Sequence, residues 1–193
     1  TAFQEGAENF VKYQHIFGFG EKTGVDLPGE ADTSALVYKA DSLGKTSLAT
    51  NSFGQNYNVS MIQMAAAFSS AINGGSYFKP HVVKQILNAN GTVMKEIEPE
   101  LLRVTCSQAT SDFLKEALYQ TVEQGTGRPA QIKGYHVGGK TGTAQKLPRY
   151  EKNYLVSFCG FAPVEDPEIL VYVIVDTPNL DGEEQASASF ATK

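Results

Sequence analysis

A lysine and two threonines alternate with glycines in Gly138–Thr143, a segment whose composition suits a β-strand. Because side chains alternate along a strand, we expect Lys140 and Gly142 to face one way and Thr141 and Thr143 the other. An ammonium group and hydroxyls can hold a carboxylate, and a glycine lets a ligand approach the backbone. The strand N–H groups can pair with a peptide-like ligand or stabilise an oxyanion. These residues predict a binding edge, although without further context a plain strand with a solvated lysine is the better interpretation.

Three glycine-rich patterns imitate nucleotide-binding motifs. Gly134–Thr141 matches GxxxxGK[ST], the phosphate-binding P-loop, which works only between a buried strand and a helix. Poor strand formers precede it, and Gly142 and Pro148 follow where the helix would begin. Gly125–Ala130 fits a dinucleotide fingerprint but follows a helical pattern, and Gly18–Gly24 misses the required spacing. We therefore predict no nucleotide site at any of them.

Length and composition narrow the possible classes of protein. The chain has 193 residues, enough for one domain or for one domain and a fragment. A hydrophobic content of 41% indicates a globular fold, and the net charge of -5 argues against nucleic-acid binding. No apolar run approaches the length of a membrane span. Only two cysteines are present, and Cys159 lies in an apolar run that predicts a buried thiol. His15, His81 and His136 are too widely separated to suggest a metal site, and no cofactor is expected.

Apolar periodicity and turn signals predict the elements of the first two thirds. The expected elements are helices at Ala7–Phe17, Val59–Ile72 and Ser107–Glu123, and a hairpin of His81–Leu87 with Thr92–Ile97. Asn58 is the expected N-cap of the second helix. Residues 18–30 form a glycine-rich loop.

The last third reads as three strands: His136–Gln145, Tyr154–Phe161 and Ile169–Asp176. Their connections are too short for crossover helices, so the strands are expected to pair antiparallel. Ile169–Asp176 is an almost unbroken β-branched run, which predicts a strand buried on both faces. The sequence therefore predicts an α+β fold in which helices cover an antiparallel sheet.

The segment KTGTAQ, Lys140–Gln145, resembles the third motif of the penicillin-binding protein and serine β-lactamase superfamily, whose motifs are SxxK, SxN and KTG. Four further segments are similar to the monofunctional, class B transpeptidases and occur in the family's order: Phe17–Glu30, Asn51–Gln55, Glu123–Gly127 and Phe158–Pro163. The resemblance runs from about residue 7 to residue 177 and is closest to the septal and sporulation-type members.

This resemblance implies a D,D-transpeptidase that cross-links peptidoglycan stem peptides through a serine acyl-enzyme and is a target of β-lactam antibiotics. By the same resemblance, Lys140 supplies positive charge and a hydrogen bond to the SxN serine, and the Thr141 hydroxyl binds the substrate carboxylate. Gly142 leaves space for the ligand, and the N–H of Thr143 is an oxyanion donor. Gln145 lines the cleft.

The other two family motifs are not found in their expected places. No SxN is present, and the SxxK at Ser42–Lys45 contains Gly44 and lies after the Phe17–Glu30 segment instead of before it. The resemblance implies that SxN and SxxK lie upstream and that the family's closing helix is missing. We expect 1–193 to be the C-terminal part of one transpeptidase domain, inactive alone. It should expose apolar surface on the Val59–Ile72 helix or on the sheet.

Two alternatives to the transpeptidase remain open, one chemically related and one of another class. A β-lactamase would need a group that activates water, and a β-lactam sensor or non-catalytic peptidoglycan-binding domain would keep the KTG edge without the nucleophile. The resemblance also implies the extracytoplasmic face of the bacterial plasma membrane, with a membrane-anchored parent recruited by the cell-wall synthesis machinery. We expect the chain itself to be soluble, without membrane or nucleic-acid contact.

Overall fold

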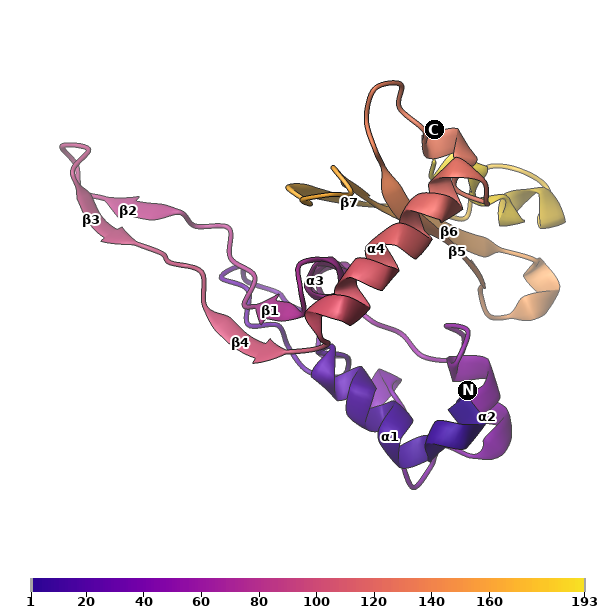
Figure 1. Cartoon of the computed structure of the whole chain (residues 1–193). Helices are drawn as coiled ribbons and strands as arrows, with labels where there is room; N and C mark the ends of the chain where they lie inside the picture. The colour runs from indigo at the N-terminus through magenta and orange to yellow at the C-terminus, as the bar shows by residue number, and fades with distance from the viewer. Residues whose placement is uncertain (1, 193) are drawn as a thin grey trace. The chain divides into compact units, whose positions relative to one another are not determined.

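A computed structural model describes residues 2–192, with side chains from residue 6 onward (Figure 1). The chain forms two compact units. The first unit consists of Thr1–Ser70 and Gly75–Cys106, and the second of Ala71–Gly74 and Ser107–Lys193. The mixed α+β fold with antiparallel strands confirms the predicted fold class.

The first unit begins with helices that pack around a small apolar core. Helix α1 spans Ala2–Ile16 with a kink at Gly6, where φ is 78° and ψ is 164°, so the part after the kink confirms the predicted Ala7–Phe17 helix. Helix α2 spans Lys45–Asn51. The core where α1 meets α2 consists of Val11, Leu43 and Leu48. A 3₁₀ turn, η1, lies at Ser34–Leu36 between the two helices.

Helix α3, Met61–Ile72, begins later than predicted, and its cap is Ser60 instead of Asn58. The Ser60 hydroxyl accepts a hydrogen bond from the Gln63 N–H at 3.2 Å, and the Gln63 side-chain oxygen accepts from the Ser60 N–H at 2.7 Å. This reciprocal pair is a capping box, which satisfies two backbone donors at once. The Asn58 prediction was wrong because a lone asparagine offers one such bond.

A long β-ribbon follows α3. Strand β1, Ser76–Phe78, pairs with β4, Leu101–Val104, and β2, Gln85–Leu87, pairs with β3, Val93–Glu96. The predicted hairpin is confirmed, with shorter strands. At the base of the ribbon the buried Tyr77 ring lies under the Arg103 guanidinium, 4.5 Å from its centre.

The second unit consists of one long helix and a three-stranded sheet. Helix α4 spans Gln108–Glu123, which confirms the helix predicted at Ser107–Glu123, and Ser107 is its N-cap. Strands β5 (Gly138–Gln145), β6 (Tyr154–Ala162) and β7 (Ile169–Asp176) pair antiparallel in the order β5-β6-β7. Four 3₁₀ turns complete this unit: η2 Arg128–Ala130, η3 Arg149–Glu151, η4 Gly182–Ala186 and η5 Ala188–Phe190.

The core of the second unit lies over β6. Val122 of α4 packs with Val137, Phe158 and Ala191, and partly buried alanines surround them. None of the helices that the structure describes combines the length and apolar composition that a membrane crossing requires.

Strand β7 is not buried on both faces, which contradicts the prediction from its β-branched run. Ile169, Val171 and Val173 are 62%, 54% and 38% exposed. Register places Val171 beside Gly160 and Val173 beside Phe158, so the open area continues the face of β6 that forms the core. The prediction was wrong because β-branched composition reports strand propensity, not what covers the strand. The expected exposed apolar surface is thereby confirmed on the sheet.

Candidate functional site

The candidate site is β5, an edge strand of its sheet. Lys140 pairs with Cys159 and Thr141 pairs with Phe158 on β6, and no described strand pairs with the other edge of β5. A strand edge presents unpaired N–H and C=O groups that an extended ligand can match. The strand conformation of Gly138–Gln145 also excludes the P-loop, since no helix follows the Lys-Thr pair.

Register confirms the alternation predicted for this strand. Lys140 and Gly142 lie on the face of Cys159 and Ser157, whereas Thr141 and Thr143 lie on the face of Phe158 and Val156. The Lys140 ammonium is exposed and donates to the carbonyl oxygen of Thr141 at 2.7 Å. The charge of Lys140 is therefore held next to the strand backbone.

A second hydroxyl meets Thr141 from outside the strand. The Oγ1 atoms of Thr141 and Thr126 are 2.9 Å apart, and Thr126 lies in the turn between α4 and η2. Thr126 was missed as a site residue, although it belongs to the Glu123–Gly127 segment that carries part of the family resemblance. Together the two threonines offer paired hydroxyls for an anionic group.

The remaining predicted residues lie further along the same strand. Thr143 Oγ1 donates to the carbonyl oxygen of Ala186, the last residue of η4, at 3.4 Å. Gln145 ends the strand, and its amide donates to the carbonyl oxygen of Arg149 at 3.1 Å in the β5–β6 connection. All five predicted positions thus belong to one strand, with Lys140–Thr143 contiguous and Gln145 at its end.

Two glycines of β5 are enclosed by β6. A side chain at Gly139 would lie 2.7 Å from the Cys159 carbonyl oxygen, and one at Gly142 would lie 2.5 Å from the Ser157 hydroxyl. The space beside Gly142 is therefore shared with Ser157. Burial raises the pKa of the neighbouring Cys159 thiol to about 12. Such a thiol is not a nucleophile at neutral pH, which confirms the prediction of a buried cysteine.

A cluster of charged groups lies where the chain enters β5. The His136 ring bonds to the Glu165 carboxylate, and Tyr119 of α4 lies with its ring centre 5.5 Å from that of His136. The hydrogen bond to Glu165, together with its charge, raises the pKa of His136, and the same bond lowers the pKa of Glu165. A depression of about 320 Å³ beside this pair is also lined by Asp112, Lys115, Glu116 and Val164. Within the described residues no His, Cys, Asp or Glu group suits a metal ion.

Ser42 and Lys45 do not share a helical turn. Ser42 is exposed in the turn before α2 and donates to the Lys39 carbonyl oxygen at 3.0 Å, while Lys45 is the first residue of the helix. Gly44 is the N-cap between them. The arrangement does not point the lysine amine at the serine hydroxyl as an SxxK pair requires.

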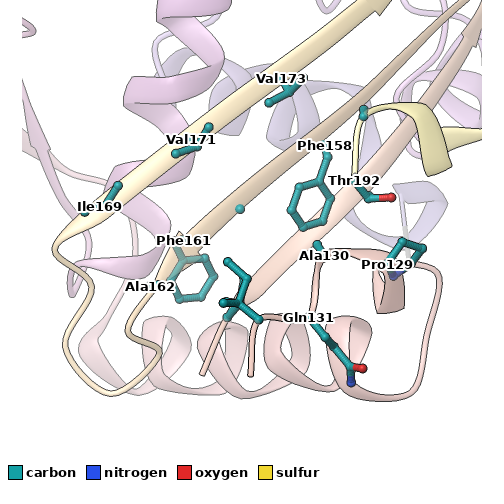
Figure 2. A pocket seen from close by; sticks show the side chains of 14 residues that line it. Pro129, Ala130, Gln131, Phe158, Phe161, Ala162, Ile169, Val171, Val173 and Thr192 are labelled. Atoms are coloured by element: carbon teal, nitrogen blue, oxygen red, sulfur yellow. The ribbon is translucent and has the colours of Figure 1, made fainter. Parts of the chain in front are cut away.

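A hollow of about 510 Å³ lies on the open face of the sheet, not at the candidate site (Figure 2). Its lining is apolar apart from Gln131 and Thr192, with Phe158, Phe161 and Val171 among its walls. Neither Lys140 nor the threonines of β5 line it. The lining contains no titratable side chain, so no general base stands beside the Thr192 hydroxyl in this hollow.

The sequence and the fold match one family. Residues 1–193 match the penicillin binding protein transpeptidase domain. Stage V sporulation protein D of Bacillus subtilis is 43% identical over 177 residues, 90% of this chain and 27% of that protein. PbpB of Mycolicibacterium smegmatis is 33% identical over 198 residues, 95% of this chain and 30% of that protein.

Solved structures give the same result. Penicillin-binding protein 3 of Mycobacterium tuberculosis complexed with ampicillin superposes with a TM-score of 0.80 at 28% identity, over 89% of this chain and 40% of that chain. The TP domain of penicillin-binding protein 3 of Burkholderia pseudomallei superposes with a TM-score of 0.81 at 27% identity, over 99% of this chain and 56% of that chain. The chain spans less than a third of the length of each of the two curated relatives.

Proposed function

The chain belongs to the penicillin-binding protein transpeptidase family, and we propose that it supplies the KTG strand of a serine D,D-transpeptidase that cross-links peptidoglycan. The observation that carries this proposal is the position of Lys140, Thr141 and Thr143 on β5, whose outer edge pairs with no described strand. The M. tuberculosis relative has been solved with ampicillin, which supports β-lactams as ligands here.

The proposed reaction proceeds through an acyl-enzyme. A serine hydroxyl attacks the carbonyl between the two terminal D-alanines of a stem peptide, and D-alanine leaves with a proton. The amine of a second stem then attacks the acyl carbon, the bond to the serine oxygen breaks, and the proton lost by the amine restores the serine hydroxyl. Lys140 provides positive charge, and the hydroxyls of Thr141 and Thr126 bind the terminal carboxylate. The N–H of Thr143 stabilises the oxyanion, Gly142 admits the ligand, and Gln145 lines the cleft.

The nucleophile of this reaction is proposed to lie outside residues 1–193. Two serines of the chain stand in an SxxK pattern: Ser42 lies in a turn without Lys45 beside it, and Ser76, three residues before Lys79, lies in strand β1 instead of on a helix. A β-lactam sensor or a peptidoglycan-binding domain would use the same strand without the serine. We also propose that the protein works at the extracytoplasmic face of the plasma membrane with the cell-wall synthesis machinery.

Intact mass after incubation with excess penicillin tests this proposal. We expect no adduct on residues 1–193 and one adduct on a longer chain that includes an upstream SxxK. An adduct on residues 1–193 would contradict the placement of the nucleophile. No adduct on either folded chain would favour the sensor or binding-domain reading.

The same assay tests the threonine pair. In the longer chain, Thr141→Val should slow acylation by roughly tenfold to a hundredfold, the value of a hydrogen bond to a charged group. Thr141→Ser keeps the hydroxyl and is the matched control. Thr126→Val should show a smaller loss in the same direction, because its hydroxyl bonds to Thr141. If all three variants are acylated as fast as the parent chain, the two hydroxyls do not take part in the proposed site.

A further inference from the structure

The β2–β3 ribbon of the first unit is exposed on both faces. Every residue from 81 to 100 is exposed except Ile97, which is half-buried. The ribbon extends as an arm beyond the β1–β4 pair (Figure 1). Six large apolar side chains on this arm are between 38% and 68% exposed: Val82, Val83, Ile86, Leu87, Val93 and Met94. Exposed apolar side chains gathered in this way mark an interaction surface more often than scattered ones do.

Specific hydrogen bonds hold the arm at both ends. At the base, the Asp26 carboxylate accepts from the N–H groups of Val82 and Val83 at 2.7 and 2.9 Å. At the tip, the Asn88 side-chain oxygen accepts from the N–H groups of Asn90 and Thr92 at 3.0 and 2.9 Å. The arm is therefore a hairpin whose backbone is held at its base and at its tip.

One face of the arm combines positive charge with apolar surface. Ile86 pairs with Lys95, and the Ile97 N–H donates to the Lys84 carbonyl oxygen, which places these four side chains on the same face. Glu96 pairs with Gln85 on the opposite face, where its carboxylate accepts from the glutamine amide at 3.2 Å. Among the described ion pairs, none involves Lys84 or Lys95.

The edges of the arm are also available for pairing. Among the described strands, β2 and β3 pair only with each other, so each has an outer edge of unpaired peptide groups. An isolated two-stranded hairpin is marginally stable in water, and a third strand would stabilise it. Addition of an extended segment to a free edge is a common mode of peptide recognition.

We propose that the β2–β3 arm docks an extended segment of another protein in which acidic side chains alternate with apolar ones. Paired with an edge of the arm, such a segment places its acidic side chains on the face of Lys84 and Lys95 and its apolar side chains on the opposite face, beside Leu87 and Val93. A bilayer suits the arm less well because it offers no partner for the free peptide edges.

Titration of the ¹⁵N-labelled chain with a synthetic peptide tests the proposal. The probe is an eight-residue peptide in which Glu alternates with Val, N-methylated along one edge so that it cannot pair with itself. We expect amide shifts confined to the β2–β3 arm. The double variant Lys84→Glu with Lys95→Glu should bind at least about tenfold more weakly, because like charges then face each other. The matched control, Lys12→Glu with Lys133→Glu, makes the same change in net charge at exposed sites and should bind as the parent does.

Three results would overturn the proposal. The first is equal affinity for a peptide in which Lys replaces Glu, or for the Lys84 and Lys95 variant, since charge would then not select the segment. The second is that the arm signals disappear when phosphatidylglycerol vesicles are added, while the peptide causes no shifts. A membrane would then be the occupant. The third is broadening that is confined to the arm signals as protein concentration rises, which would make a second copy of the chain the occupant.

Discussion

At the scale of single residues, the glycines of β5 differ in what would meet an added side chain. At Gly139 the neighbour includes the Cys159 carbonyl oxygen, which is backbone and cannot move without distorting the sheet. At Gly142 the neighbour is the Ser157 hydroxyl, which can rotate. The two glycines therefore have different tolerance, although both lie in the same strand.

This difference gives a prediction for stability. Gly139→Ala should lower the free energy of unfolding by about 1–3 kcal/mol, the usual cost of overpacking, and Gly142→Ala by less than about 1 kcal/mol. Urea unfolding of both variants measures the difference. In a Ser157→Ala background the cost of Gly142→Ala should fall further, because the clashing hydroxyl is gone. An equal cost for the two single variants would contradict the packing described for β5.

Some residue-level features could be predicted from the sequence and others could not. The alternation of Lys140 and Thr141 follows from strand geometry alone. The Ser60 cap was also readable, because a serine followed by Gln63 is the signature of a capping box. The meeting of Thr126 with Thr141 was not, since it depends on how the turn after α4 packs against β5.

At the scale of elements, the start of β5 is fastened to the β6–β7 connection. The Val164 N–H donates to the His136 carbonyl oxygen at 3.1 Å, and the His136 ring bonds to Glu165. Side chains of α4 face this pair: Asp112, Lys115, Glu116, Tyr119 and Glu123. The protonation state of His136 therefore affects how firmly the start of β5, the strand that carries the candidate site, is held to the β6–β7 connection.

The His136–Glu165 pair predicts a pH dependence. The pKa of His136 is raised above its ordinary value of 6.5. The stabilisation that protonated His136 gives to the fold is therefore complete below pH 6.5 and is lost as pH rises through the raised pKa. The pKa of Glu165 is lowered below its ordinary value of 4.5. The stabilisation that ionised Glu165 gives to the fold is therefore complete above pH 4.5 and is lost as pH falls through the lowered pKa. The coupling should therefore be strongest between pH 4.5 and 6.5.

A double-mutant cycle with His136→Gln and Glu165→Gln checks this dependence. Urea unfolding should show a coupling free energy between the two sites within that window and none near pH ~9, where histidine is neutral. A coupling that stays constant across this range would mean that the contact is not ionic.

The elements themselves were largely predictable because local signals agree with the fold. Three strands with short connections leave antiparallel pairing as the available solution, and Ser107 marks the start of α4. The burial of β7 was not predictable in the same way. Its β-branched run fits a buried strand, yet Ile169, Val171 and Val173 are exposed, and only the surrounding structure decides that.

At the scale of the whole molecule, the open face of β7 should govern behaviour in solution. It combines three exposed β-branched side chains, the apolar hollow, and a strand edge that pairs with no other described strand (Figure 2). A long apolar edge strand is a template for pairing with another chain. We therefore predict that residues 1–193 self-associate as concentration rises.

Sedimentation velocity over a concentration series measures this association. Val171→Lys places a charge in the middle of the apolar face and should weaken association by roughly tenfold or more, since burying an unpaired charge is costly. Leu147→Lys makes the same change in charge at a side chain that is 81% exposed in the β5–β6 connection, and it should associate as the parent does. A chain that remains a folded monomer at every concentration would contradict the prediction. Equal weakening by both variants would show that net charge, and not the β7 face, controls the assembly.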